Sequence, residues 1–119
     1  MTYNKYRNKP QEEDGIKFAS KAETRRYQEL KLLIRAGEIT DLETHPSFVL
    51  QEAWTDKHGN AHSPIIYKAD FMYKDKEKYG RTIVEDVKGG KGTQTPVFKL
   101  KIKLLLFKYQ DIEFVIVEM

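Results

Sequence analysis

The chain has 119 residues and no cysteine. That absence excludes a disulfide framework, a thiolate zinc site and a cysteine nucleophile. The sequence also lacks any apolar run near the roughly 20 residues of a membrane-spanning helix, and its polar first ten residues lack the apolar stretch of a signal peptide. We therefore expect a soluble, cytoplasmic protein without membrane contacts, with the length of one domain.

Acidic residues are missing from two segments. The overall charge of +3 says little, but residues 88–108 contain six lysines and no acid, and residues 1–10 contain three basic residues and no acid. If these side chains share a face, they form a positive patch suited to the phosphates of nucleic acid. A solvated helix face explains the same pattern equally well.

The first expected helix runs from Ser20 to about Ala36. Ser20 and Glu23 have the spacing of a capping box, with the hydroxyl at the N-cap and the carboxylate three residues on. Apolar residues at helical spacing predict a buried stripe made of Tyr27, Leu30, Leu33 and Ile34. Glu23 stands at the head of this apolar face, so it serves either as a cap or as a site residue.

The rest of the chain predicts three strands, a second helix and a last strand. Residues 97–104 alternate as a strand would, but the Thr95-Pro96 start and the apolar run 104–107 favour a helix through Tyr109. The expected strands are Phe48–Trp54, Ile65–Tyr73, Thr82–Lys88 and Ile112–Val117. The order αβββαβ indicates a single α/β domain over residues 15–119 whose mixed central sheet contains a parallel pair, preceded by a flexible basic arm over residues 1–14.

Charged residues inside two of these strands are the informative exceptions. Period two places Asp70 on one face of its strand, and it places Asp86 and Lys88 together on one face of the next. If the strands are neighbours, both carboxylates lie near the same end with the lysine one step further. That convergence is costly unless a cation lies between the carboxylates. The alternative is that both are ordinary polar residues of edge strands.

These residues, taken together, resemble a known superfamily. The order αβββαβ, with Glu23 on the first helix, Asp70 in one strand, Asp86-Val-Lys88 in the next and a lysine-rich helix after it, is similar to the PD-(D/E)XK nucleases. More narrowly, the stretches 14–23, 68–73 and 84–89 resemble small phage and prophage proteins of that superfamily, similar to phage junction-resolving endonucleases. The resemblance runs from about residue 3 to residue 118. The resemblance implies a restriction-endonuclease-like core and a phage or prophage protein of the bacterial cytoplasm.

The resemblance also implies an activity and a site. It implies Mg²⁺- or Mn²⁺-dependent hydrolysis of DNA phosphodiester bonds, with Lys88 orienting or activating the attacking water. The implied metal ligands are the side chains of Glu23, Asp70 and Asp86 and the backbone carbonyl of Val87. The chain departs from the superfamily pattern in two places: no proline precedes Asp70, and Asp86 replaces the commoner glutamate. The shorter Asp86 side chain leaves the metal preference open.

The expected partner is DNA, structured or branched by analogy with junction-cutting members of the superfamily. The candidate phosphate contacts are Lys5, Arg7, Lys91, Lys99 and Lys103. A homodimer would let two sites address paired strands. The alternative of a different class is a non-catalytic DNA-binding module with a nuclease-like fold.

Two other motifs are weaker. His58 and His62 are four residues apart, but Gly59-Asn60 between them predicts a turn and not the helix of a zinc site. The glycine-rich segment 88–93 does not match the phosphate-loop pattern, so no nucleotide cofactor is expected.

Overall fold

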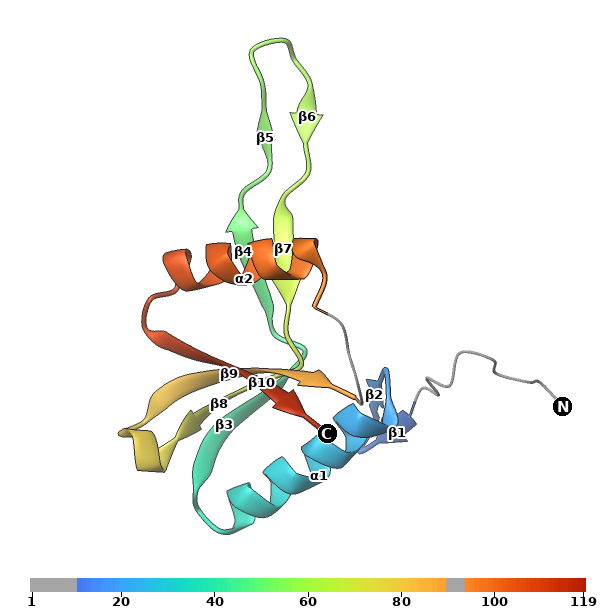
Figure 1. Cartoon of the computed structure of the whole chain (residues 1–119), viewed down its shortest axis with the longest axis vertical. Helices are drawn as coiled ribbons and strands as arrows, with labels where there is room; N and C mark the ends of the chain where they lie inside the picture. The colour runs from blue at the N-terminus through green and yellow to red at the C-terminus, as the bar shows by residue number, and fades with distance from the viewer. Residues whose placement is uncertain (1–10, 90–93) are drawn as a thin grey trace, which may run out of the picture.

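The computed structural model describes residues 11–89 and 94–119. Its centre is a mixed four-stranded sheet in the order β10-β9-β8-β3, in which β10 runs parallel to β9 and the other pairs are antiparallel. These strands are β3 (Ile39–Thr44), β8 (Phe71–Asp75), β9 (Arg81–Lys88) and β10 (Ile112–Glu118). Helix α1 (Lys21–Arg35) lies on one side of the sheet and α2 (Pro96–Lys108) on the other (Figure 1).

Side chains on alternate faces of β9 pack into two separate hydrophobic cores. Ile83 and Val87 point toward α1 and join a buried cluster that contains Tyr27 and Leu30 of that helix. Val84 points the other way and packs in a second cluster with Leu105 of α2. Period two therefore divides β9 into two faces, and each face packs against a different helix. The chain forms a single mixed α/β domain with a parallel strand pair, and this prediction is confirmed.

Both helices begin at the predicted residues. The Ser20 hydroxyl accepts a hydrogen bond from the Glu23 N–H at 3.2 Å, and the Thr95 hydroxyl accepts one from the Phe98 N–H at 3.1 Å. Each hydroxyl satisfies an N–H that has no partner within its helix. The prediction that Ile34 is buried is wrong: the residue is 41% exposed, whereas its neighbour Leu33 packs against the buried cluster.

The predicted strand Ile65–Tyr73 is divided in two. β7 (Ile65–Lys68) pairs with β4 (Ser47–Gln51), whereas β8 pairs with β3 and β9. The division falls at Ala69-Asp70, where the Ala69 N–H donates to Pro46 and the Asp70 N–H donates to Glu85. Because the chain changes partners there, Asp70 lies immediately before β8 and not within one continuous strand.

The β4–β7 pair continues into a ribbon that projects beyond α2 (Figure 1). Its outer part is β5 (Trp54–Thr55) paired with β6 (Ala61–His62), in place of the single strand expected through Trp54. Residues 56–60, which contain the turn predicted at Gly59-Asn60, join the two strands, with the Asp56 N–H donating to the Asn60 carbonyl.

Two further segments of the fold differ from the sequence prediction. β3 was not predicted; a bulge between Thr40 and Glu43 interrupts its pairing and its period-two pattern. β1 (Gln11–Glu13) pairs with β2 (Ile16–Phe18), although the sequence placed residues 11–14 in the arm. Residues 1–10 of that arm lie outside the described residues. In the described part of the chain, the helices are too short or too polar to cross a membrane.

Candidate metal centre

A cavity of about 390 Å³ opens where the start of α1, the break before β8 and the end of β9 meet. Glu23, Asp70, Asp86 and Lys88 all line it, and Val87 and Ser20 complete much of its wall. The structure therefore brings together the four residues that the resemblance named as catalytic. They come from three separate segments of the chain, so only the tertiary fold assembles them.

Glu23 reaches the cavity from the first turn of α1. The residue is buried, with 6% of its surface exposed. Its N–H is bound by Ser20, but among the described residues its carboxylate makes no return hydrogen bond to the Ser20 N–H. The reciprocal half of a capping box is thus missing, and the carboxylate points to a role in the cavity rather than in the helix cap.

Asp70 is held by backbone contacts on both sides. Its Oδ2 accepts a hydrogen bond from the Val87 N–H at 2.6 Å, and its carbonyl accepts one from the His45 N–H at 2.9 Å. Burial first, and then hydrogen bonding and charge from the neighbouring Glu23 carboxylate, raise the pKa of Asp70 to about 8. Since the N–H and C=O of a strand residue point to the same side, the Val87 carbonyl also points toward the Asp70 side of β9.

Asp86 and Lys88 form a second, adjoining group. Asp86 accepts a hydrogen bond from the Tyr67 hydroxyl at 2.6 Å, and its other oxygen lies 3.0 Å from the Lys88 ammonium. Burial and then the bond to Asp86 raise the pKa of Tyr67, so the hydroxyl stays a donor. The Lys88 ammonium also lies 4.2 Å from the centre of the Phe98 ring. Each charged group of this ion pair therefore has a second contact that holds it: Tyr67 for Asp86, and Phe98 for Lys88.

His45 is a site residue that the sequence reasoning missed. In residues 11–89 and 94–119, the histidine and acidic side chains that gather closely enough to hold a metal ion are Glu23, His45 and Asp70, whose ligand atoms lie within 4.8 Å of one another. Asp86 lines the same cavity but is not part of this group. His45 carries no periodic signal in the sequence, because it lies in the turn between β3 and β4.

One protein-family model matches nearly the whole chain. A family model described as "Protein of unknown function (DUF1064)" matches residues 3–118. The chain belongs to this family. No curated protein and no solved structure matches it. In this DUF1064 domain, the cavity and its charged lining are therefore the features that indicate a function.

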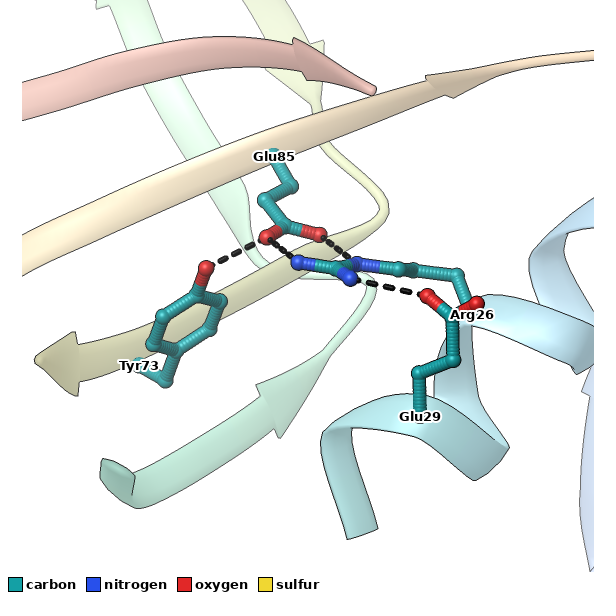
Figure 2. A network of polar contacts seen from close by, with 4 residues as sticks. All are labelled: Arg26, Glu29, Tyr73 and Glu85. Atoms are coloured by element: carbon teal, nitrogen blue, oxygen red, sulfur yellow. Dashed lines mark hydrogen bonds and ion pairs between the residues drawn. The ribbon is translucent and has the colours of Figure 1, made fainter. Parts of the chain in front are cut away.

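A buried network lies beside the cavity of the DUF1064 domain (Figure 2). Arg26 donates to both oxygens of Glu85, from Nε at 2.9 Å and from Nη2 at 2.6 Å, and it also donates to Glu29 at 2.9 Å. The Tyr73 hydroxyl donates to the same Glu85 carboxylate. Glu85 is 1% exposed, so its charge is compensated entirely by these neighbours.

This network ties α1 to β9 at the site. Arg26 lies one turn after Glu23 on the helix, and Glu85 directly precedes Asp86 on the strand. The Arg26–Glu85 pair therefore fixes the separation of the two elements that carry Glu23 and Asp86. A helix displaced along the sheet would break two charge-assisted hydrogen bonds.

The structure describes two of the five lysine and arginine residues predicted to contact DNA. Lys99 and Lys103 are exposed on α2, outside the lining of the cavity. Phe98, the neighbour of Lys99, touches Lys88, so the start of α2 adjoins the site. The other three candidates, Lys5, Arg7 and Lys91, lie outside the described residues.

Proposed function

We propose that this chain is a divalent-metal-dependent endonuclease that hydrolyses DNA phosphodiester bonds, built on the restriction-endonuclease-like αβββαβ core of the PD-(D/E)XK superfamily. The observation that carries the proposal is the convergence of Glu23, Asp70, Asp86 and Lys88 on one cavity. Three carboxylates and a lysine beside a buried strand end form a costly arrangement for a purely structural role. The carboxylates suit a cation, and the lysine suits a phosphate.

The donor set fits a divalent cation. After burial, the neighbouring Glu23 carboxylate contributes to the raised pKa of Asp70, about 8. A cation between two carboxylates favours the ionised form and offsets the repulsion of like charges. Asp70 and Glu23 would hold the ion, with Asp86 and the Val87 carbonyl completing the oxygen ligands. When bound, the ion polarises the phosphate and lowers the pKa of a bound water.

Lys88 supplies the positive charge of the site. Its ammonium is positioned by Asp86 and by the Phe98 ring, so it does not need to be ordered when the substrate arrives. A fixed cation at this position offsets the negative charge that develops on the pentavalent phosphate. Lys99 and Lys103 extend the positive surface along α2 and would bind the DNA backbone. By analogy with the superfamily, the substrate is structured or branched DNA cut by a homodimer.

A cleavage assay tests this function. Wild type is incubated with single-stranded, duplex, flap and four-way DNA in Mg²⁺ or Mn²⁺, next to Asp70→Asn, Asp86→Asn and Lys88→Ala. We expect cleavage by wild type, its loss in all three variants and continued DNA binding. Asp111→Asn is the matched control, because Asp111 is exposed and lies away from the cavity. DNA binding by wild type without metal-dependent cleavage or a metal-dependent shift in melting would replace the nuclease by a binding module.

A further inference from the structure

We propose that His45 is a nitrogen ligand of the metal site, so that the site binds first-row transition-metal ions such as Co²⁺ and Mn²⁺ more tightly than Mg²⁺. This inference rests on the proposed metal site and extends it to the choice of ion. The sequence and the superfamily resemblance point only to oxygen ligands. The structure adds an imidazole to them.

The position of the imidazole carries the first step. The His45 Nε2 atom lies 3.9 Å from Glu23 Oε1, and both residues share with Asp70 a set of ligand atoms that lie within 4.8 Å of one another. The imidazole is only partly exposed, at 28% of its side chain, and the Phe18 ring packs against it at 5.7 Å between centroids. The nitrogen is thus directed at two carboxylates from a packed position.

The backbone fixes His45 to the same segment as Asp70. Its φ angle is 53°, in the left-handed region that non-glycine residues rarely adopt. The conformation is held because the His45 N–H donates to the Asp70 carbonyl at 2.9 Å and the next residue, Pro46, accepts a bond from Ala69 at 3.0 Å. Strained residues held in this way are concentrated at functional sites. The backbone of His45 is therefore joined directly to that of Asp70.

The ligand atoms of the site determine which metal ion it prefers. Mg²⁺ takes oxygen ligands almost exclusively, whereas imidazole suits transition metals, whose affinity for a given site rises from Mn²⁺ through Co²⁺ to Ni²⁺. Two carboxylates and one imidazole form a mixed oxygen and nitrogen set. Removing the imidazole should weaken transition-metal binding strongly and Mg²⁺ binding little.

Metal titration by calorimetry tests the selectivity, with no DNA present. His45→Asn is the informative variant, because asparagine tolerates a positive φ but has no imidazole. His58→Asn is the matched control, since His58 lies in the turn of the projecting ribbon. We expect wild type and His58→Asn to bind Co²⁺ at least tenfold more tightly than Mg²⁺. In His45→Asn, the Kd for Co²⁺ should rise about 100-fold and the Kd for Mg²⁺ less than threefold. Equal Co²⁺ affinity in wild type and His45→Asn would overturn the inference.

Pulsed electron paramagnetic resonance on the Mn²⁺-loaded protein gives a second, direct measurement. A ¹⁴N coupling should be present in wild type and in a double variant that lacks His58 and His62. His45 is the only histidine left in that variant, so the coupling there would assign the nitrogen ligand to His45 without the use of His45→Asn. Absence of nitrogen coupling in wild type that binds Mn²⁺ and cleaves DNA would overturn the His45 inference alone. Wild type that binds neither Co²⁺ nor Mg²⁺ would overturn the metal site and with it the proposed function.

Discussion

Replacing Arg26 by methionine should destabilise the domain strongly, because it leaves the buried Glu85 carboxylate without its cation. Methionine keeps most of the apolar stem of arginine, so the change removes charge and hydrogen bonds more than packing. Glu85 is 1% exposed and would retain, of its partners in Figure 2, only the Tyr73 hydroxyl. Water cannot replace the two missing donors at a side chain that is so deeply buried.

The expected destabilisation is large compared with the stability of a domain this size. Breaking a buried ion pair by removing one partner costs about 3–5 kcal/mol. The bond from Arg26 to Glu29 adds little, since the Glu29 side chain is 47% exposed and such pairs contribute about 0–1 kcal/mol. From a total free energy of unfolding of roughly 5–15 kcal/mol, this destabilisation should lower the Tm by about 10–20 °C.

Urea unfolding followed by circular dichroism measures this change. Glu29→Gln is the matched control and should change the free energy of unfolding by about 1 kcal/mol or less. The double variant Arg26→Met with Glu85→Gln should recover most of the stability, because no uncompensated charge remains buried. A cost below about 1 kcal/mol for Arg26→Met, or a double variant no more stable than the single one, would refute the reasoning.

Three further predictions concern the cavity and α2. The pKa of Asp70 is raised in the fold to about 8 from an ordinary value of 3.8, so ionisation opposes folding: the metal-free protein should lose stability as the pH rises from about 4 to about 8. Thermal melts should show this decrease in wild type, and Asp70→Asn should abolish it and be at least as stable at pH 8. Glu23→Gln should lower cleavage at limiting Mg²⁺ while the Tm barely changes, and full activity would leave Glu23 without a role in the cavity. Neutralising Lys99 and Lys103 should change how DNA affinity depends on salt. The slope of log affinity against log salt concentration should fall by about 0.9 for each duplex phosphate that these lysines neutralise in wild type. Neutralising Lys57, on the projecting ribbon, is the control, and an unchanged slope in the Lys99 and Lys103 variant would place both lysines away from DNA.

Local signals determined much of the fold. A cap hydroxyl, its N–H partner and an apolar stripe lie within a few residues of one another, so Ser20 and Thr95 were enough to locate the starts of both helices. Alternation within β9 likewise fixed which of its residues share a face, and each face joins a separate core. A parallel pair in the sheet followed from the crossover helix before the last strand, and β9 and β10 form that pair.

The cavity was predicted in outline. Asp70 and Asp86 were expected to meet because their strands were expected to pair, and β8 and β9 do pair. The resemblance gave Glu23 and Lys88 their expected roles, and both residues line the same cavity. Each of these residues carried a signal in its own segment, as a charge within an apolar pattern.

Only the tertiary structure decided the remaining features. The break before Asp70 depends on Pro46 and Glu85, which are distant in sequence, and the bulge in β3 hides its strand pattern. His45 joins the carboxylates through a turn without periodicity, and Arg26 finds Glu85 across 59 residues. Periodicity and capping express contacts between residues that are close along the chain. Side chains that meet across the sheet leave no such trace, because their partners are chosen by how the elements pack.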